Sequence, residues 1–284
     1  MRQRQGKWHA DVASILLLAA FVLLAYAIDA VLKPHLEGPG LVVLGIVLAL
    51  VPAVIWLGFF YRRDRLEPEP RTMVVGVFLL GAFVASAVAI PLVDQVFDVG
   101  SWLRGSLIIQ LLGAILVVGF TQEALKYLTL RLSVYNSSEF DERTDGVIYA
   151  TAVGLGFATA LNVAFVVGSG GVDLGNGTVR IVVTALAHAG FAGVMGYFLG
   201  RQKLEDRPIW WMPLGVSLAA VLNGLFFFLR TNTGGSGLGG PLDAIAPWIG
   251  LALAAVLAVV VTAVLSRLMA RELAEAEAAS PVSA

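Results

Sequence analysis

Long apolar stretches separated by short polar segments dominate the chain. Eight of these stretches hold about 20 mostly apolar residues, the length that crosses the roughly 30 Å hydrocarbon core of a bilayer. We expect spans near Val12–Leu32, Leu41–Tyr61, Met73–Val93, Leu107–Leu130, Gly146–Val167, Ile181–Leu199, Trp210–Leu229 and Ala244–Met269. The pattern predicts an all-α, polytopic membrane helical bundle. We expect residues 1–270 to form a single transmembrane domain and residues 271–284 a polar C-terminal tail.

The basic residues predict the orientation of these spans. If the N-terminus is cytoplasmic, 15 of the 19 Lys and Arg residues fall in or beside cytoplasmic segments and four fall on the other side. Such a bias toward the cytoplasm is typical of membrane proteins. Because the bias alternates from loop to loop, it supports eight spans with both termini in the cytoplasm.

The first span has a second interpretation. Basic residues, an apolar run and then "AYA" also fit a signal peptide cleaved after Ala27. The apolar run is close to a full span and exceeds the usual 7–15 residues of a signal peptide core. We therefore expect the first span to be retained.

Composition narrows the classes of protein and partner. Apolar residues make up 58% of the chain and charged residues 14%, against about 25% charged in soluble domains. This excludes a soluble globule and a disordered chain, and it makes the lipid bilayer the expected partner. The net charge of −1, without a basic block, gives no sign of a nucleic-acid partner. The absence of Cys excludes disulfides, a thiol nucleophile and Cys-based metal sites.

Few polar side chains lie within the spans, and such residues are functional candidates by default. Glu123 and Lys126 lie one turn apart in "GFTQEALKYL". They form either a local ion pair at a helix end or a carboxylate presented to a cavity, with its charge held by Lys126. His188 lies near the middle of the sixth span, where an imidazole needs a partner. It serves either a structural hydrogen bond or a site.

Helix packing is the competing explanation for the remaining polar residues. Gly154, Ala158 and Asn162 recur every four residues and share one helix face. Small residues let a neighbouring helix approach, and an Asn can then hydrogen-bond across. Asn223, beside Gly224, allows the same interpretation.

The same residues limit metal chemistry. A catalytic Zn²⁺ takes three protein ligands and keeps one position for water. Glu123 and His188 are two good donors, and we take them as the candidate metal ligands, whereas Gln122, Asn162 and Asn223 offer only neutral amide oxygens. Two good donors make a weak zinc site, and neither H-E-x-x-H nor G-x-S-x-G occurs in the chain.

Five stretches, taken in order, give the chain a family resemblance. They are "YRRDRLEPEPR" (61–71), "QEALK" (122–126), "EFDERTDGVIYATAVGLGFATALN" (139–162), "HAGFAGVMGYFLG" (188–200) and "LNGLFFFL" (222–229). With them the chain resembles the PrsW family of bacterial intramembrane proteases, which is related to the CAAX-processing and bacteriocin-processing membrane proteases. The second stretch is similar to that family's E-E-x-x-K motif. The third looks like its G-x-G-F-A-x-x-E-N segment, and the last matches the place of its H-G-x-x-N helix.

The resemblance implies a function and a set of site residues. It implies a protease of the bacterial cytoplasmic membrane that cleaves single-span membrane proteins such as anti-sigma factors, with Glu and His residues that bind a metal and activate water. Glu123 matches the second Glu of the paired motif, Lys126 its Lys and His188 the first His.

Four positions depart from the family pattern. Gln122 stands where the first Glu is expected, and Leu161 where the Glu before Asn162 is expected. Asn223 replaces the second His and Phe227 the Asn that follows it. Leu161 cannot ligate a metal or transfer a proton, and Asn223 cannot act as a base.

Three functions stay open at this point. In the first, catalysis is weakened or lost, and the protein binds membrane segments in a polar cleft that includes Asn162 and Asn223. In the second, the protease is active with a rearranged site. Glu123 is then base or ligand and His188 a ligand, while Gln122 or Asn223 stabilises the oxyanion. In the third, the polar residues belong to a small transporter, channel or lipid-binding scaffold.

Overall fold

The computed structural model describes residues 16–29, 31, 38–63, 69–102, 105–172 and 174–232, with scattered positions between 252 and 271. This part of the chain is built of helices and turns, without strands. Six of its helical stretches are long and apolar enough to cross a membrane. They are Pro39–Gly58, Arg71–Val96, Leu107–Ser133, Arg143–Gly168, Gly177–Leu204 and Trp211–Asn232. A shorter apolar helix, Leu16–Asp29, precedes them.

These stretches coincide with the second to seventh expected spans, so the predicted all-α membrane bundle is confirmed. Leu16–Asp29 lies inside the first expected span. The eighth span, Ala244–Met269, falls largely outside the described residues, as do residues 64–68 of the first loop and nearly all of the tail 271–284. The count of eight spans, the orientation of the termini and the single domain therefore stay predictions.

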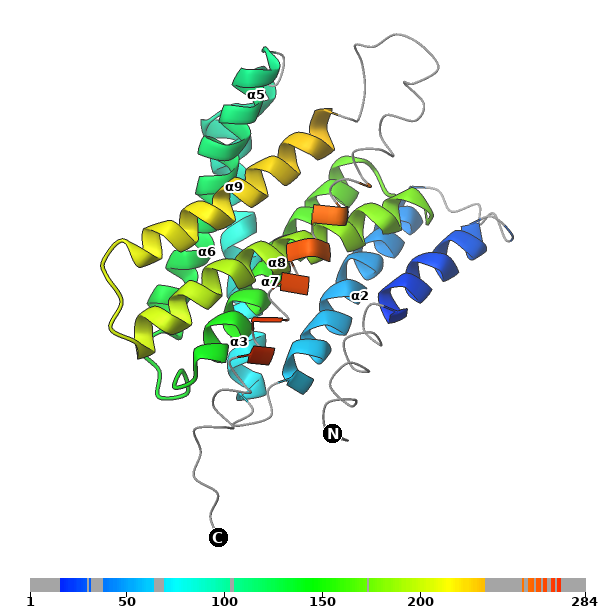
Figure 1. The fold of residues 1–284 in the computed structure, drawn as a ribbon. Helices are drawn as coiled ribbons and strands as arrows, with labels where there is room; N and C mark the ends of the chain where they lie inside the picture. The colour runs from blue at the N-terminus through cyan, green and yellow to red at the C-terminus, as the bar shows by residue number, and fades with distance from the viewer. Residues whose placement is uncertain are drawn as a thin grey trace.

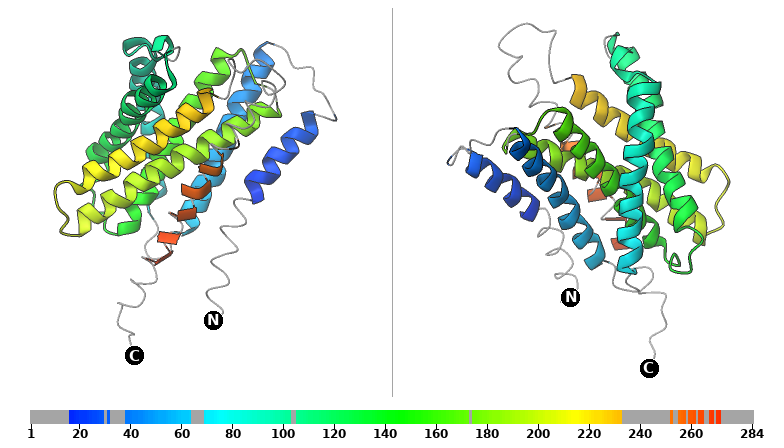
Figure 2. Two further views of the ribbon diagram at one scale, coloured as in Figure 1. Left: turned by 45° about the horizontal axis from the view of Figure 1, so that its top comes forward. Right: turned by 180° about the vertical axis from the view of Figure 1, so that it is seen from behind.

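Two helices form the centre of the bundle. α7 (Arg143–Gly168) and α8 (Asn176–Leu204) lie against each other, with α2 (Pro39–Arg63) and α3 (Arg71–Val84) on one side and α9 (Trp211–Asn232) on the other (Figures 1 and 2). The most apolar windows of α7 and α8 are 72% and 78% buried, whereas those of the other four long stretches are 28–39% buried. The outer helices therefore present apolar side chains outward, as a lipid-facing surface requires.

Small residues bring α7 and α8 into close contact. A β-carbon at Gly154 would overlap the carbonyl oxygen of His188, and one at Gly196 would overlap the carbonyl oxygen of Gly146. Glycines on both helices thus let the two backbones meet, which is how helices associate where lipid removes the hydrophobic driving force. The packing expected from the four-residue repeat is present in the structure.

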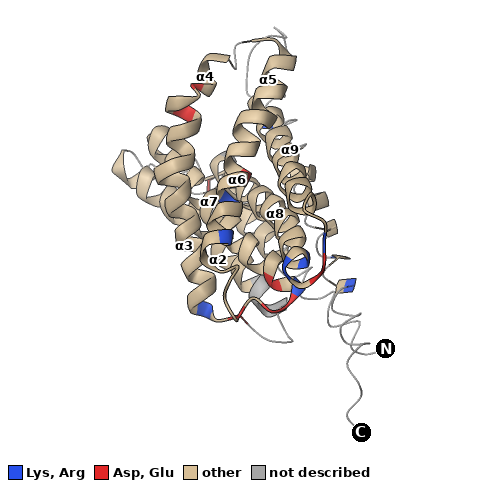
Figure 3. Cartoon of the chain, turned by 90° about the vertical axis from the view of Figure 1, so that its left-hand side faces the viewer, with Lys and Arg blue, Asp and Glu red and all other residues tan. Residues whose placement is uncertain are grey.

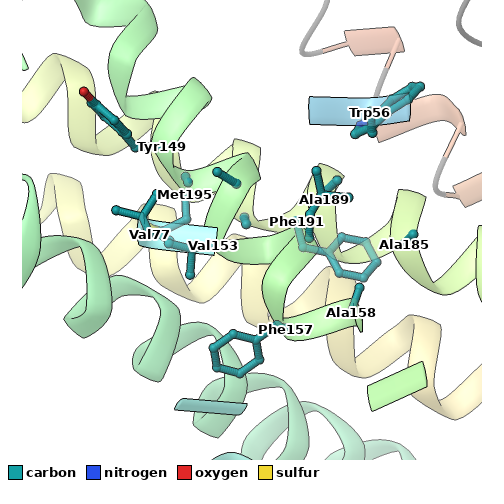
Figure 4. Close-up of a cluster of buried hydrophobic side chains, with 14 of the residues drawn as sticks. Trp56, Val77, Tyr149, Val153, Phe157, Ala158, Ala185, Ala189, Phe191 and Met195 are labelled. Carbon is teal, nitrogen blue, oxygen red and sulfur yellow. The ribbon is translucent and has the colours of Figure 1, made fainter. Parts of the chain in front are cut away.

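Large side chains fill the space around this contact. Trp56 from α2, Tyr149 and Phe157 from α7 and Phe191 from α8 are each less than 2% exposed (Figure 4). Met195 adds a flexible side chain to the same cluster. The centre of the bundle is therefore close-packed and holds α7 and α8 in a fixed relation.

Two of the long stretches contain π-helical segments. α3 leads into η1 (Ala85–Ala89) and then η2 (Leu92–Val96), which begins after Pro91. The next stretch runs from α5 (Leu107–Gly113) through η3 (Ala114–Gly119) into α6 (Phe120–Ser133), and α4 (Val99–Trp102) is a short helix between the two stretches. π-helical turns are frequent at functional sites, and the residues that follow η3 are the site candidates.

Charged positions are distributed unevenly along the bundle. Most of them gather at the end opposite α4 and α5, while the helices are otherwise largely free of charge along their lengths (Figure 3). The charges that do lie inside the bundle therefore require a specific explanation.

Candidate functional site

Close helix contact positions the first site residues. A β-carbon at Gly119, the last residue of η3, would overlap the carbonyl oxygen of Ala220 in α9. A β-carbon at Gly224 would likewise meet the backbone of Ala114 and Ile115. Since both glycines lack a side chain, the start of α6 lies directly beside the middle of α9. The sequence thus places "QEALK" next to Asn223.

Glu123 is the centre of a buried polar cluster. Its Oε1 accepts hydrogen bonds from Lys126 Nζ at 2.6 Å and from Asn223 Nδ2 at 2.7 Å. Asn223 Nδ2 also lies 3.0 Å from Gln122 Oε1. Glu123 and Lys126 are fully buried and Asn223 is 1% exposed. The contact of Glu123 with Lys126, which both interpretations of the sequence contain, is present, and Asn223 of α9 adds to it.

Lys126 links this carboxylate to the imidazole of α8. Its Nζ lies 3.0 Å from His188 Nδ1 and 5.3 Å from the ring centroid of Phe157. An ammonium group has only donors, so Nδ1 of His188 must accept and the ring hydrogen then resides on Nε2. We call Gln122, Glu123, Lys126, His188 and Asn223 the central cluster, since all lie well inside their spans.

One oxygen of the central cluster is left without a partner. Glu123 Oε2 is buried and makes no hydrogen bond to the described residues. A buried carboxylate oxygen without a donor costs free energy. It is therefore the point of the cluster where a further donor would bind most favourably.

A cavity of about 320 Å³ lies beside the central cluster and is lined by Gln122, His188 and Asn223. Leu161 and Phe227 line the same cavity. All four positions that depart from the family pattern therefore meet around one space, although α6, α7 and α9 supply them from separate parts of the chain. The departures are concentrated at one site.

Asn162 is not brought into the central cluster. Its Nδ2 donates to the carbonyl oxygen of Ile181 in α8 at 3.1 Å, and the residue is 2% exposed. This is the bond between helices that the packing interpretation expects. Its neighbour Leu161 lines the cavity instead.

The donors present do not fit a catalytic zinc site. Within the described residues, no group of three or more His, Cys, Asp and Glu side chains lies close enough to hold a metal. The two candidate ligands, Glu123 and His188, both contact the Lys126 ammonium. A histidine that binds a metal through one ring nitrogen normally donates the N–H of the other to an acceptor. In His188, Nδ1 instead faces the Lys126 ammonium, which is a donor. A divalent metal would also be repelled by Lys126.

Three further charged residues line the cavity and were not among the candidates. They are Asp94 of η2, Arg180 of α8 and Arg230 of α9. In the sequence, the two arginines contribute only to the charge count on each side of the membrane. The signal that points to them is position: Arg230 is the one basic residue of Trp211–Asn232, and Arg180 lies 21 residues before the next arginine of its stretch, Arg201.

A second buried polar group lies near one end of the bundle. The Tyr149 hydroxyl donates to Glu69 Oε2, and both residues are at most 3% exposed. Asp145 Oδ2 accepts from the backbone N–H groups of Asp141 and Glu142, at 2.9 and 2.5 Å, as part of a capping box for α7. We call Glu69, Asp145 and Tyr149 the end cluster. It gives a structural role to Glu69 of the "EPEP" stretch, which ties the start of α3 to α7.

Comparison with known proteins gives consistent matches. The sequence profile described as PrsW family intramembrane metalloprotease matches residues 69–265. A relative named Protease PrsW from Bacillus subtilis (strain 168) is 30% identical over 184 residues, which cover 64% of this chain and 80% of the relative. Another, from Halalkalibacterium halodurans, is 31% identical over 179 residues, covering 63% and 79%. A third, from Clostridioides difficile (strain 630), is 29% identical over 187 residues, covering 64% and 77%. No solved structure matches the chain.

The profile match, residues 69–265, extends through the segments that carry the central cluster and the cavity. With bacterial relatives and the six long apolar stretches of its described part, the chain is an integral membrane protein of the bacterial cell membrane.

Proposed function

The chain belongs to the PrsW family of intramembrane metalloproteases, and we propose that it is a member with weakened or lost hydrolysis that binds single-span membrane proteins. Anti-sigma factors are the expected kind of client. The protein would hold a membrane segment in the cavity beside the central cluster without cleaving it efficiently.

One observation carries this proposal. The four positions that depart from the family pattern are 122, 161, 223 and 227, and all of them line the cavity that His188 also lines. The residues present there are an amide, a leucine, a second amide and a phenylalanine. Amides do not take up a proton at neutral pH, and they bind zinc poorly. Leucine and phenylalanine side chains can neither transfer a proton nor bind a metal. The substitutions therefore remove acid–base and metal-binding groups from one place.

The charges that remain argue in the same direction. Glu123 and Lys126 form a fully buried pair, and Lys126 also occupies Nδ1 of His188. The carboxylate and the imidazole are therefore already engaged by side chains of the protein, Glu123 by Lys126 and Asn223 and His188 by Lys126. The cluster is thus better suited to a fixed polar surface than to proton transfer.

The same surface can bind a peptide backbone. Gln122 and Asn223 offer amide groups, while Leu161 and Phe227 offer apolar contacts in the same cavity. A membrane segment whose helix is locally broken exposes N–H and C=O groups that need such partners inside a bilayer. Amides can satisfy both kinds of group because they donate and accept.

The test compares the natural chain with a variant in which the family residues are restored. The protein is co-expressed with a panel of single-span membrane proteins that includes anti-sigma factors, and both co-purification and cleavage are measured. The natural chain should retain a client and leave it intact. The triple variant Gln122→Glu, Leu161→Glu, Asn223→His should cleave more of the same client.

The matched control is the triple variant that also carries Glu123→Gln, which should lose any cleavage that was gained. Robust cleavage by the natural chain that disappears in Glu123→Ala would overturn the proposal in favour of an active protease. Failure to retain any client of the panel would count against the binding function.

A further inference from the structure

We propose that Arg180 and Arg230 form a binding site for the phosphodiester headgroup of a membrane phospholipid, in the cavity that His188 and Asn223 of the central cluster also line. The site uses other residues than the central cluster and does not depend on whether the protein cleaves its clients. The proposal rests on the pairing, depth and charge of these arginines.

Neither arginine has an anionic partner in the described part of the chain. No carboxylate there lies within salt-bridge distance of Arg180 or Arg230, although both guanidinium groups line the cavity. Arginines on transmembrane helices are costly and are normally paired. Two such groups in one cavity therefore indicate an anion that comes from outside the described residues, and a lipid headgroup supplies one.

Aromatic rings hold both guanidinium groups in place. Arg180 Cζ lies 3.3 Å from the ring centroid of Phe165, and Arg230 Cζ lies 5.5 Å from that of Phe226. Arg230 Nη1 also donates to Thr184 Oγ1 at 3.3 Å. Stacking uses the flat face of the guanidinium and leaves its edge N–H donors for an acceptor. Two guanidinium forks of fixed orientation suit the several oxygens of a phosphate.

The depth of the arginines matches the headgroup region. The stretch Gly177–Leu204 has 28 residues, or about 42 Å at 1.5 Å per residue. It is therefore longer than the roughly 30 Å hydrocarbon core, and its ends reach the headgroups. Arg180 is the fourth residue of this stretch, and Arg230 is the third from the end of Trp211–Asn232. Both thus lie at the level where phospholipid phosphates reside.

Charge favours a lipid over free phosphate. Asp94 lines the same cavity and is exposed, so the three side chains together carry about one positive charge. A phosphodiester carries one negative charge, whereas a free phosphate group carries about −1.5 to −2 at neutral pH. The second negative charge of a free phosphate would be repelled by Asp94, and no further cation among the cavity-lining residues balances it. The singly charged diester of a phospholipid is the better match.

The experiment titrates lipid into the purified, delipidated full-length protein in detergent and measures apparent Kd by native mass spectrometry. Phosphatidylglycerol supplies the phosphodiester, and diacylglycerol with the same acyl chains lacks it. The natural chain should bind phosphatidylglycerol at least tenfold more tightly than diacylglycerol. In Arg180→Gln/Arg230→Gln this preference should fall at least tenfold.

Two further variants separate recognition from folding. Arg180→Lys/Arg230→Lys keeps the charge but loses the planar guanidinium donors. Its preference for phosphatidylglycerol over diacylglycerol should lie between those of the natural chain and the Gln variant. Arg131→Gln is the matched control, since Arg131 also stacks on an aromatic ring, that of Tyr135, but at the other end of the bundle. It should bind phosphatidylglycerol as the natural chain does. Circular dichroism should give the same helix content for every variant.

Three results would overturn the proposal. The first is undiminished preference for phosphatidylglycerol in the Gln variant. The second is displacement of phosphatidylglycerol by an equal concentration of inorganic phosphate, which would assign the site to a soluble anion. The third is tighter binding of a single-span peptide with acidic flanking residues, lost in the same variant, which would assign the site to a protein partner.

Discussion

The central cluster and the end cluster are both buried and polar, and each keeps one buried carboxylate oxygen without a hydrogen bond to the described residues, Glu123 Oε2 and Asp145 Oδ1. They differ in what their other contacts connect. In the end cluster, Tyr149 donates to Glu69, and Asp145 accepts two backbone N–H groups at the start of α7. In the central cluster, Glu123 accepts from Lys126 of its own helix and from Asn223 of α9, so its contacts join two spans inside the bundle. Of the two clusters, the central cluster has members that line the 320 Å³ cavity, and the end cluster has none there.

The difference shows how a buried polar group with a structural role can be distinguished from one with a functional role. The end cluster connects a loop to a helix, so its hydrogen bonds explain why those residues are present. The central cluster connects three helices that small residues already hold together, so packing alone does not explain its charges. A charge that the fold does not need, beside a cavity, is a functional candidate.

Of the changes that test the difference between the two clusters, removal of Lys126 should have the largest effect on stability. Lys126→Ala leaves the Glu123 carboxylate buried and unpaired, which should lower the free energy of unfolding by about 3–5 kcal/mol. Thermal unfolding of the purified protein in detergent measures the loss. The matched control is Glu123→Gln/Lys126→Met, which removes both charges at similar volume and should unfold close to the natural chain. If the double variant is destabilised as much as Lys126→Ala, packing rather than charge holds the central cluster.

Tyr149→Phe should have a smaller effect, confined to the end cluster. The change removes one donor from the buried Glu69 carboxylate and should cost about 1–3 kcal/mol in unfolding free energy. The same thermal unfolding assay applies. Retention of a co-expressed client should not change, because Tyr149 does not line the cavity. Loss of client binding at normal stability would contradict the structural role given to this cluster.

Asn162→Ala should have the smallest effect. It removes one hydrogen bond between α7 and α8, and such bonds contribute about 0.6 kcal/mol on average inside membranes. Thr159→Val is the control, because the Thr159 hydroxyl bonds to Leu155 of its own helix. Client retention should survive both changes. A loss of client binding in Asn162→Ala, but not in Thr159→Val, would show that Asn162 belongs to the client-binding site.

The predictability of the fold has a simple basis. Bilayer thickness fixes the length of an apolar helix, so the second to seventh spans could be placed from hydropathy alone. The four-residue repeat of small residues likewise predicted that a neighbouring helix packs closely against α7, and the structure identifies that helix as α8. The π-helical segments η1, η2 and η3 could not be foreseen, because they depend on local backbone strain and packing rather than on the apolar pattern.

The site was predictable only in part. Glu123 and Lys126 are close in sequence, so their pairing follows from helix geometry. Their contact with His188 and Asn223 joins residues 62 and 100 positions away, and no local pattern encodes such a distance. Asn162 shows the opposite case: its polarity suggested a site, but the carbonyl of Ile181 satisfies it.

The sequence alone determined that this protein is a membrane helical bundle of the PrsW type with substituted site residues, because length, hydropathy and motif order are written along the chain. Only the tertiary structure decided that the four substituted positions, His188 and two arginines line one cavity. The physical reason is that glycine contacts on α7, α8 and α9 set how closely the backbones approach. That approach fixes which side chains from distant spans meet.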